Sequence, residues 1–427
     1  MYTIDDIITE ERIEALRKIR NKKREENFAA LVSSMGEAAV DEIRKIYDMF
    51  DERMLIWLAG LWDAEIGGFY FSNSARDNDG FLPDLESTNQ AVVFIAEQCA
   101  LPGDEMPITK IPERFSKKIS DWAYELQDED GYFYHPQWGK DVPHTRRSRD
   151  VMAAWRLIEP LGRECRYVRP TKRPKDEPPE SNPTLPEYLR STDAFSTWLK
   201  GQQIDKRSYQ FGHFINSTAS QIIAAGQEYV DLLVSWLNEH QYSENGLWEP
   251  QVSYSSVNGL MKLALCYPDF GAALPYPEKS YESARAAVLS DEPLTFACEF
   301  YNAWAALNAS IKSMDEKMAD EYRMKLRAHA PEMIRVTGEK MAKCRVSDGS
   351  FAYFTAESGK VCTHSQGVPV ALDNVREGDI NGNGCSTSAP LRHMFAAFGV
   401  EKPPLFCPED AELVFELMDA KSFLEKS

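Results

Sequence analysis

Along most of the chain, charged amphipathic segments alternate with segments that carry few charges and many small residues. The charged segments cover about residues 40–60, 113–127, 187–200, 228–241, 279–289 and 315–344. The low-charge segments span residues 86–98, 149–160, 214–226, 254–266, 298–310 and 385–398. Helices of the second kind are typical of positions buried on most sides. The alternation predicts an all-α fold in which low-charge inner helices lie inside charged outer ones, as in a closed ring of six or seven helical hairpins.

Turn-rich loops precede the low-charge segments. The longest is residues 60–90, GLWDAEIGGFYFSNSARDNDGFLPDLESTNQ, in which Gly permits positive φ angles and Asp or Asn favours turns. The run from Asp84 to Thr88 marks the start of a helix, because the side chains of Ser87 and Thr88 can accept hydrogen bonds from the first turn. Shorter stretches of the same character occupy residues 127–134, 244–249, 347–353 and 377–382. We therefore expect the loops to gather near the starts of the inner helices.

We expect one domain over residues 1–427, because the hairpin pattern runs through nearly the whole chain. Residues 1–32 form a charged helical arm, and a last helix spans about 408–424. The proline- and charge-rich stretch 163–186 is predicted to be a surface insertion. A small β-hairpin is predicted in the last long loop, from SFAYFT to GKVCTHS.

The stretch LWDAEIGGFYFS…DNDG, residues 61–80, resembles the first-hairpin region of the N-acylglucosamine 2-epimerase group. The wider pattern resembles the (α/α) toroid, or six-hairpin, superfamily of carbohydrate-active enzymes, which includes polysaccharide lyases and glycoside hydrolases. This resemblance implies an (α/α)6-type toroid, a sugar substrate and a site at the mouth of the ring. The epimerase group uses a pair of histidines there, for which His364 and His393 are the candidates, although their surroundings depart from that group's pattern.

The composition narrows the classes of function. With 67 acidic and 48 basic residues, the net charge of −19 argues against general nucleic-acid binding. The charged N-terminus lacks the apolar core of a signal peptide, and no stretch has the length of a membrane span, so we expect a cytoplasmic protein. The eight cysteines form no CxxC pair and the seven histidines are scattered, so we expect neither a disulfide framework nor a bound metal or cofactor. The composition leaves open whether the chain forms homo-oligomers.

Side chains suited to proton transfer collect where the inner helices begin. His and Tyr can act as general base and acid, and two opposed carboxylates form the catalytic pair of glycoside hydrolases. The candidate catalytic residues are His213, Tyr254, Tyr301, Glu299, Glu86 and Asp150.

Other side chains at these positions are suited to binding an acidic sugar. The arginine fork pairs with carboxylates, amides bind hydroxyl groups, and aromatic rings stack on sugar faces. The candidate substrate-binding residues are Asn216, Asn258, Asn302, Arg146, Arg149, Trp138, Trp248 and His364. The shared position predicts one cavity lined by Glu86, Arg149, His213, Asn216, Tyr254 and Tyr301.

Three functions fit this set. The first is β-elimination from a uronic-acid-containing oligo- or polysaccharide, with His213 or Tyr254 as base and Tyr301 as acid. The second is glycoside hydrolysis by two carboxylates. The third is a sugar epimerase or isomerase, or a toroid that binds sugar without catalysis. The expected partner in every case is a sugar, with an acidic one favoured.

Overall fold

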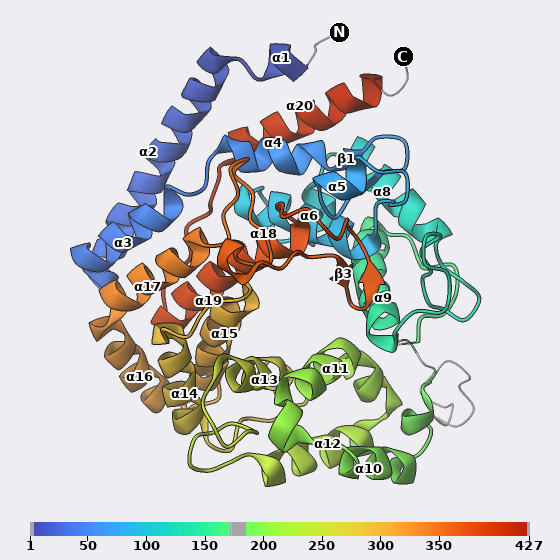
Figure 1. The fold of residues 1–427 in the computed structure, drawn as a ribbon, viewed down its shortest axis with the longest axis vertical. Helices are drawn as coiled ribbons and strands as arrows, with labels where there is room; N and C mark the ends of the chain where they lie inside the picture. The colour runs from blue at the N-terminus through green and yellow to red at the C-terminus, as the bar shows by residue number, and fades with distance from the viewer. Residues whose placement is uncertain (1–3, 171, 173–184, 425–427) are drawn as a thin grey trace.

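The computed structural model describes residues 4–170, 172 and 185–424, and over this range it is mostly helical with two small two-stranded sheets (Figure 1). The predicted all-α class is confirmed. The six low-charge segments are helical and mostly buried. They correspond to α6 (Leu85–Gln98), α9 (His144–Ile158), α11 (Ile204–Ala225), α13 (Tyr254–Ala264), α15 (Cys298–Lys312) and the pair α18 (Ile380–Ser386) and α19 (Ser388–Phe398).

The six low-charge segments contact one another in cyclic order. Helix α6 contacts α9, α9 contacts α11, α11 contacts α13, and α13 contacts α15. The order returns to its start because α15 contacts α19, α19 contacts α18, and α18 contacts α6. Figure 1 shows these helices surrounding the centre of the molecule. The small residues are needed for these contacts: a Cβ placed on Gly259 of α13 would lie 2.1 Å from the Ser208 hydroxyl of α11.

The charged segments pack outside this set. Helix α8 contacts α9, α12 contacts α11, α14 contacts α13 and α15, and α16 contacts α15 and α19. The outer helices are α8 (Glu113–Glu125), α10 (Thr192–Lys200), α12 (Gln227–His240), α14 (Pro277–Leu289), α16 (Glu316–Ala328) and α17 (Ala330–Ala342). Helix α15 touches neighbours on several sides, so all its residues from Cys298 to Ile311 are buried except Tyr301.

Several helix boundaries differ from the prediction. The predicted helix 315–344 is two helices that meet at His329, because Pro331 starts α17 and cannot continue the hydrogen-bond ladder of α16. The predicted helix 40–60 is likewise two, α3 (Glu37–Tyr47) and α4 (Glu52–Gly60), with Asp51 capping the second. Helix α9 begins at His144, directly after Pro143, so the arginines that follow lie on a helix and not in a turn.

The predicted β-hairpin forms in part from different residues: β3 (His364–Ser365) lies at the end of the predicted segment 359–365, but its partner is not the segment 350–355. Strand β3 pairs with β4 (Val368–Pro369), whereas residues 350–355 make only isolated bridges, with Phe351 opposite Arg345 and Phe354 opposite Phe296. Gln366 and Gly367 both have positive φ, 54° and 88°, which is typical of a two-residue hairpin turn. A second small sheet joins β1 (Trp62–Asp63) and β2 (Gly68–Phe69) in the first long loop.

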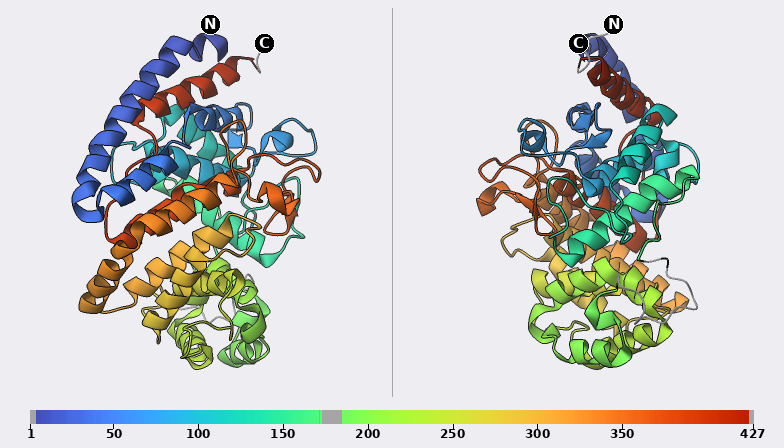
Figure 2. Two further views of the ribbon diagram at one scale, coloured as in Figure 1. Left: turned by 60° about the vertical axis from the view of Figure 1, so that its left-hand side comes forward. Right: turned by 90° about the vertical axis from the view of Figure 1, so that its right-hand side faces the viewer.

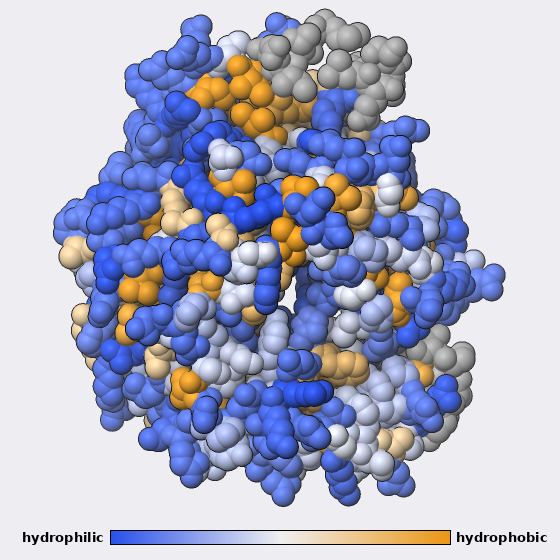
Figure 3. Space-filling view, in the orientation of Figure 1, coloured by the Kyte–Doolittle hydropathy of each residue, from blue (hydrophilic) through white to orange (hydrophobic). Residues whose placement is uncertain are grey.

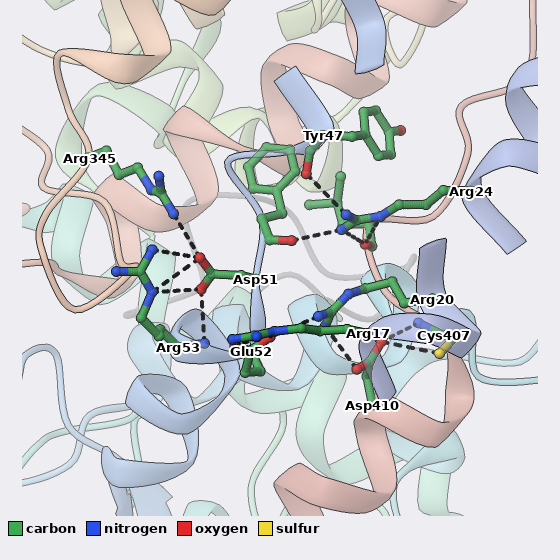
Figure 4. A network of polar contacts seen from close by, with 12 residues as sticks. Arg17, Arg20, Arg24, Tyr47, Asp51, Glu52, Arg53, Arg345, Cys407 and Asp410 are labelled. Carbon is green, nitrogen blue, oxygen red and sulfur yellow. Dashed lines mark hydrogen bonds and ion pairs between the residues drawn. The ribbon is translucent and has the colours of Figure 1, made fainter. Parts of the chain in front are cut away.

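Helices from the two ends of the chain lie side by side (Figure 2). The N-terminal segment contains α1 (Ile4–Ile7) and α2 (Glu10–Met35), and the predicted tail helix is α20 (Pro408–Leu424). Figure 4 shows the polar network between them: Arg20 of α2 donates to Asp410 of α20 at 3.0 Å and to Glu52 of α4 at 2.9 Å. All three side chains are nearly fully buried, so the arm of residues 4–32 is part of the packed structure.

Shorter helices occupy the connecting segments. They are α5 (Asn73–Arg76), α7 (Pro107–Lys110) and the 3-10 turns η1 (Glu159–Leu161), η3 (Glu187–Leu189) and η4 (Ala356–Ser358). Much of the predicted insertion 163–186 lies outside the described residues. In its described part, Arg163 pairs with Asp121 at 2.7 Å and Arg166 with Glu125 at 2.6 Å, both on α8. Among the helices that the structure describes, none has the length and apolar character needed to cross a membrane.

Candidate functional site

A cavity of about 510 Å³ lies among the six low-charge segments, and the face in Figure 3 is hollowed near its centre. Two of its walls are helical stripes. On α6 the lining residues are Glu86, Asn89, Gln90, Val93 and Phe94, and on α9 they are Arg149, Met152, Ala153 and Arg156. Residues at these spacings share one helix face. Each stripe is polar near the helix start, so the cavity contains charged groups as well as apolar surface.

The other walls come from later elements. Helix α11 contributes Tyr209 and His213, α13 contributes Lys262, and α15 contributes Cys298 and Tyr301. The long loop before α18 adds Tyr353, Cys362, His364, Ser365 and Gln366, and the last pair of helices adds Asn381, Asn383, Cys385 and Arg392. Residues as far apart in the sequence as Glu86 and Arg392 therefore meet at one site.

The charge of the cavity is opposite to that of the protein. Its described lining holds four basic side chains, Arg149, Arg156, Lys262 and Arg392, and one carboxylate, Glu86. None of the four cations forms an ion pair with a described carboxylate; Arg149 donates to the Ser217 hydroxyl at 3.3 Å. In a chain of net charge −19, four unpaired cations around one cavity create a local positive potential.

Lys262 is the most constrained of these cations. It lies on α13 with its Cβ against Gly212 of α11, and no described side chain accepts a hydrogen bond from its ammonium group. Burial first, and the nearby Arg149 second, lower the pKa of Lys262. A half-buried ammonium without a partner is costly for the folded state, which points to a function for its charge.

The single cavity carboxylate is already held by the protein. Glu86 accepts a hydrogen bond from Ser365 at 3.0 Å and lies 3.4 Å from Arg146. Arg146 is fully buried behind the cavity wall and also pairs with Asp84 at 2.9 Å and with Asp150 at 2.8 Å. The ring of Trp138 stacks on the Arg146 guanidinium at 4.4 Å. The single guanidinium of Arg146 therefore pairs with three carboxylates.

This cluster shifts the two aspartates in opposite directions. Burial raises the pKa of Asp150 to about 7, because the attraction of Arg146 is shared with the negative charges of Asp84 and Glu86. Burial also acts on Asp84, but Arg146 and the hydrogen bonds from Ser87 outweigh it and lower the pKa of Asp84. Neither aspartate lines the cavity; Asp84 caps the start of α6.

His213 is linked to the β3–β4 turn across the cavity. Its Nε2 lies 2.8 Å from Oε1 of Gln366, which assigns the proton to Nε2 and leaves Nδ1 as an acceptor without a described partner. Burial, Lys262 and Arg149, in that order, lower the pKa of His213 to about 4. The imidazole is therefore neutral at pH 7 and able to take up a proton.

Three tyrosines of the cavity stay protonated. Burial raises the pKa values of Tyr209, Tyr301 and Tyr353 well above the ordinary value of a phenol. The ring of Tyr209 lies 6.2 Å from that of His213. These hydroxyl groups are proton donors at neutral pH, so the cavity holds a neutral base and several weak acids.

The structure places five of the predicted site residues on the cavity and the others away from it. Glu86, Arg149, His213, Tyr301 and His364 line the cavity. Tyr254 is buried at the start of α13, where its hydroxyl donates to the Ser290 carbonyl at 3.2 Å. Glu299 accepts backbone N–H groups from Thr295 at 2.6 Å and Phe296 at 3.2 Å, so it holds the turn before α15. Arg146 and Asp150 form the ion-pair cluster behind the wall.

The predicted amide and tryptophan contacts also lie outside the cavity. Asn216 donates to the sulfur of Cys266 at 3.6 Å, and Asn258 and Asn302 are buried between helices. Trp248 is fully buried with its indole N–H bonded to Leu237, and Trp138 lies against Arg146 and donates to Pro369. Of the histidine pair suggested by the resemblance, His364 lines the cavity, whereas His393 is buried and lies 3.2 Å from the Asn308 amide.

Sequence reasoning missed Lys262, Arg156 and the facing thiols Cys298 and Cys385. The sequence contains an indication for Lys262, because it is the only charged residue in the low-charge segment 254–266 and lies one helical turn after Asn258. Arg156 lies seven residues after Arg149 and shares its helix face. The thiols carried no such signal, since they are 87 residues apart.

A second hollow, of about 790 Å³, lies over α8 on the outside of the molecule. Its lining holds three acidic and three basic side chains, and some are paired, for example Lys117 with Asp121 at 2.6 Å, so it lacks the unbalanced charge of the central cavity. Within the described part of the chain, no group of three or more His, Cys, Asp or Glu side chains is placed to hold a metal ion. Comparison of the sequence and the structure with family models, curated proteins and solved structures found no match.

Proposed function

We propose that this protein is a carbohydrate-active enzyme that binds a uronic-acid-containing saccharide in the central cavity and cleaves it by β-elimination. The observation that carries the proposal is the group of four unpaired cations around a cavity with a single carboxylate, Glu86, which already contacts Arg146 and Ser365. A substrate carboxylate supplies the charge that these cations lack. Neutral sugars would leave them without partners, at a cost in binding free energy.

We further infer that the fold is an (α/α) toroid. The cyclic contact order of the six low-charge segments, with charged helices outside them, supports this architecture. The position of the cavity among the inner helices agrees with the location of sites in helical rings.

The cavity contains groups suited to the steps of uronate elimination. Cations at the substrate carboxylate stabilise the dianionic intermediate formed when the neighbouring C5 proton is removed. His213 is the candidate base. When an anionic substrate offsets Lys262 and Arg149, the pKa of His213 is expected to rise toward its ordinary value, which strengthens the base in the complex. Tyr301 is the candidate acid that protonates the leaving oxygen, and its raised pKa keeps it protonated beforehand.

Hydrolysis by two carboxylates is supported less well. Of the predicted catalytic carboxylates, Asp150 belongs to the Arg146 cluster and Glu299 holds a turn. A further carboxylate, Glu249, accepts hydrogen bonds from Ser208 at 2.6 and 2.9 Å. Among the carboxylates of the described residues, only Glu86 lines the cavity. A hydrolytic pair needs an acid and a second carboxylate on opposite sides of the bond.

The direct test is incubation of the purified chain with defined uronate oligosaccharides and, as controls, neutral oligosaccharides of the same length. Elimination creates a C=C bond conjugated to the carboxylate, so we expect ultraviolet absorbance to rise with the acidic substrates only. Mass spectrometry checks that the two product masses sum to the substrate mass without added water. Products that contain one added water, with no new absorbance, would establish hydrolysis instead.

Lys262→Met is expected to weaken binding of an acidic ligand about tenfold while stabilising the protein by about 0.5–2 kcal/mol, because it removes a half-buried cation without a partner. Titration calorimetry with the uronate oligosaccharide and denaturant unfolding measure the two effects. The exposed Lys18→Met is the matched control and should change neither quantity. A variant that loses stability and keeps its affinity would show that Lys262 is structural.

A further inference from the structure

Two thiols from distant parts of the sequence face each other in the cavity wall. Cys298 is the first residue of α15 and Cys385 lies near the end of α18, and their sulfur atoms are 3.8 Å apart. Both residues line the cavity. Their helices contact one another, so the packing of the inner helices holds the two sulfurs together.

The surroundings distinguish the two sulfurs. The Tyr353 hydroxyl donates to Cys298 at 3.4 Å, and Cys385 lies 3.7 Å from the Asn381 side-chain oxygen. The hydrogen bond with Cys385 is the main cause that lowers the pKa of Cys298 to about 7, and Lys262 and Tyr353 contribute against the effect of burial. The same interaction raises the pKa of Cys385. Cys298 also occupies a helix N-terminus, which favours a thiolate.

We propose that Cys298 and Cys385 form a redox-active dithiol site that reacts with small anionic disulfides entering the cavity. The Cys298 thiolate attacks one sulfur of the disulfide, forming a mixed disulfide and releasing the first thiolate. Cys385, after giving up its proton, attacks the Cys298 sulfur, releases the second thiol and closes a Cys298–Cys385 bond. The dithiol loses two electrons and the small disulfide gains them.

The geometry requires only a local movement for closure. The sulfurs must approach from 3.8 Å to about 2.05 Å, a change of about 1.8 Å. The four cations of the cavity raise the local concentration of an anionic reagent, and the same cations repel a cationic one. This reactivity is separate from sugar chemistry, since it needs neither His213 nor Tyr301.

The other thiols provide internal controls. Cys165 is half-buried and lies away from the cavity, where burial raises its pKa to about 11. Cys362 lines the cavity, and burial raises its pKa as well. Cys298 is only 7 % exposed, less than Cys165 or Cys362. If solvent exposure alone determined thiol reactivity, Cys165 and Cys362 would therefore react at least as fast as Cys298.

The test uses the full-length reduced protein and one equivalent of 5,5′-dithiobis(2-nitrobenzoate), an anionic aromatic disulfide. We expect release of two thiolates per disulfide consumed and peptide mapping that finds the Cys298–Cys385 bond. In Cys385→Ser we expect one thiolate and a stable adduct on Cys298, and Cys165→Ser should behave as the wild type. At low salt, the cationic aliphatic disulfide cystamine should react at least tenfold more slowly than 3,3′-dithiodipropionate, an anionic aliphatic disulfide, and neither carries the activated aromatic leaving group.

Mapping of the wild type decides the proposal even if a variant folds poorly. First reaction at Cys165 or Cys362, or retention of the aromatic adduct without a bond between Cys298 and Cys385, would overturn it. Equal rates for the anionic and cationic disulfides would overturn the assignment of the reagent's charge.

Discussion

Replacing Arg146 by methionine is expected to lower the free energy of unfolding by about 3–5 kcal/mol, the largest stability effect that we predict for a single site. The substitution keeps much of the apolar contact with Trp138 and removes the one cation shared by Asp84, Glu86 and Asp150. Asp84 and Asp150 are nearly fully buried, so water cannot replace the lost charge. Urea unfolding followed by circular dichroism measures the change.

The pH dependence of this loss identifies its cause. Without Arg146, the pKa of Asp84 in the folded state rises above its unfolded value, and the pKa of Asp150, which burial already raises, rises further. Such groups stabilise the fold below the unfolded pKa and lose that contribution as pH rises through the folded pKa. The deficit of the variant should therefore be largest at neutral pH and shrink toward pH 4. The exposed Arg335→Met, which breaks a surface pair with Glu339, should cost no more than about 1 kcal/mol. An equal cost at pH 7 and pH 4 would attribute the loss to packing instead of charge.

His213→Ala is expected to lower turnover of a uronate oligosaccharide by about 10²–10⁴-fold, the range typical of removing a general base. His213 is the neutral imidazole of the cavity, with Nδ1 free to accept a proton because Nε2 faces Gln366. Tyr301→Phe should produce a loss of similar size if its hydroxyl protonates the leaving oxygen. Initial rates from the absorbance of the unsaturated product measure both.

Two further variants distinguish elimination from hydrolysis. The exposed His240→Ala on α12 is the matched control and should keep wild-type turnover, because it lies away from the cavity. Glu86→Gln removes the cavity carboxylate without changing its size, and under elimination its effect should remain smaller than that of His213→Ala. The reverse order, with near-normal turnover in His213→Ala and none in Glu86→Gln, would exclude His213 as the base and favour hydrolysis.

The sequence by itself determined the fold class and the position of most helices. Charge distribution separates buried from exposed helices, because a charged side chain at a fully buried position needs a partner. This is why the low-charge segment 298–310 is the buried α15. The break that Pro331 makes in the predicted helix 315–344 was not predicted. The sequence also singled out His213, Arg149, Glu86, Tyr301 and His364, which line one cavity, although His213 lies well inside α11 and His364 lies on β3.

Only the tertiary structure decided which polar side chains remain unpaired. In the sequence, Tyr254, Glu299 and Asp150 have the same position and residue types as the cavity residues. In the structure each has a partner within the protein: Tyr254 donates to the Ser290 carbonyl, Glu299 accepts from two backbone N–H groups, and Asp150 pairs with Arg146. The rotation of each helix about its axis selects which residues of a stripe face inward, and helix packing sets that rotation. The same packing leaves Lys262 without a described carboxylate partner and brings Cys298 within 3.8 Å of Cys385. Pairing depends on distances between residues far apart in the chain, so residue type and spacing alone do not determine it.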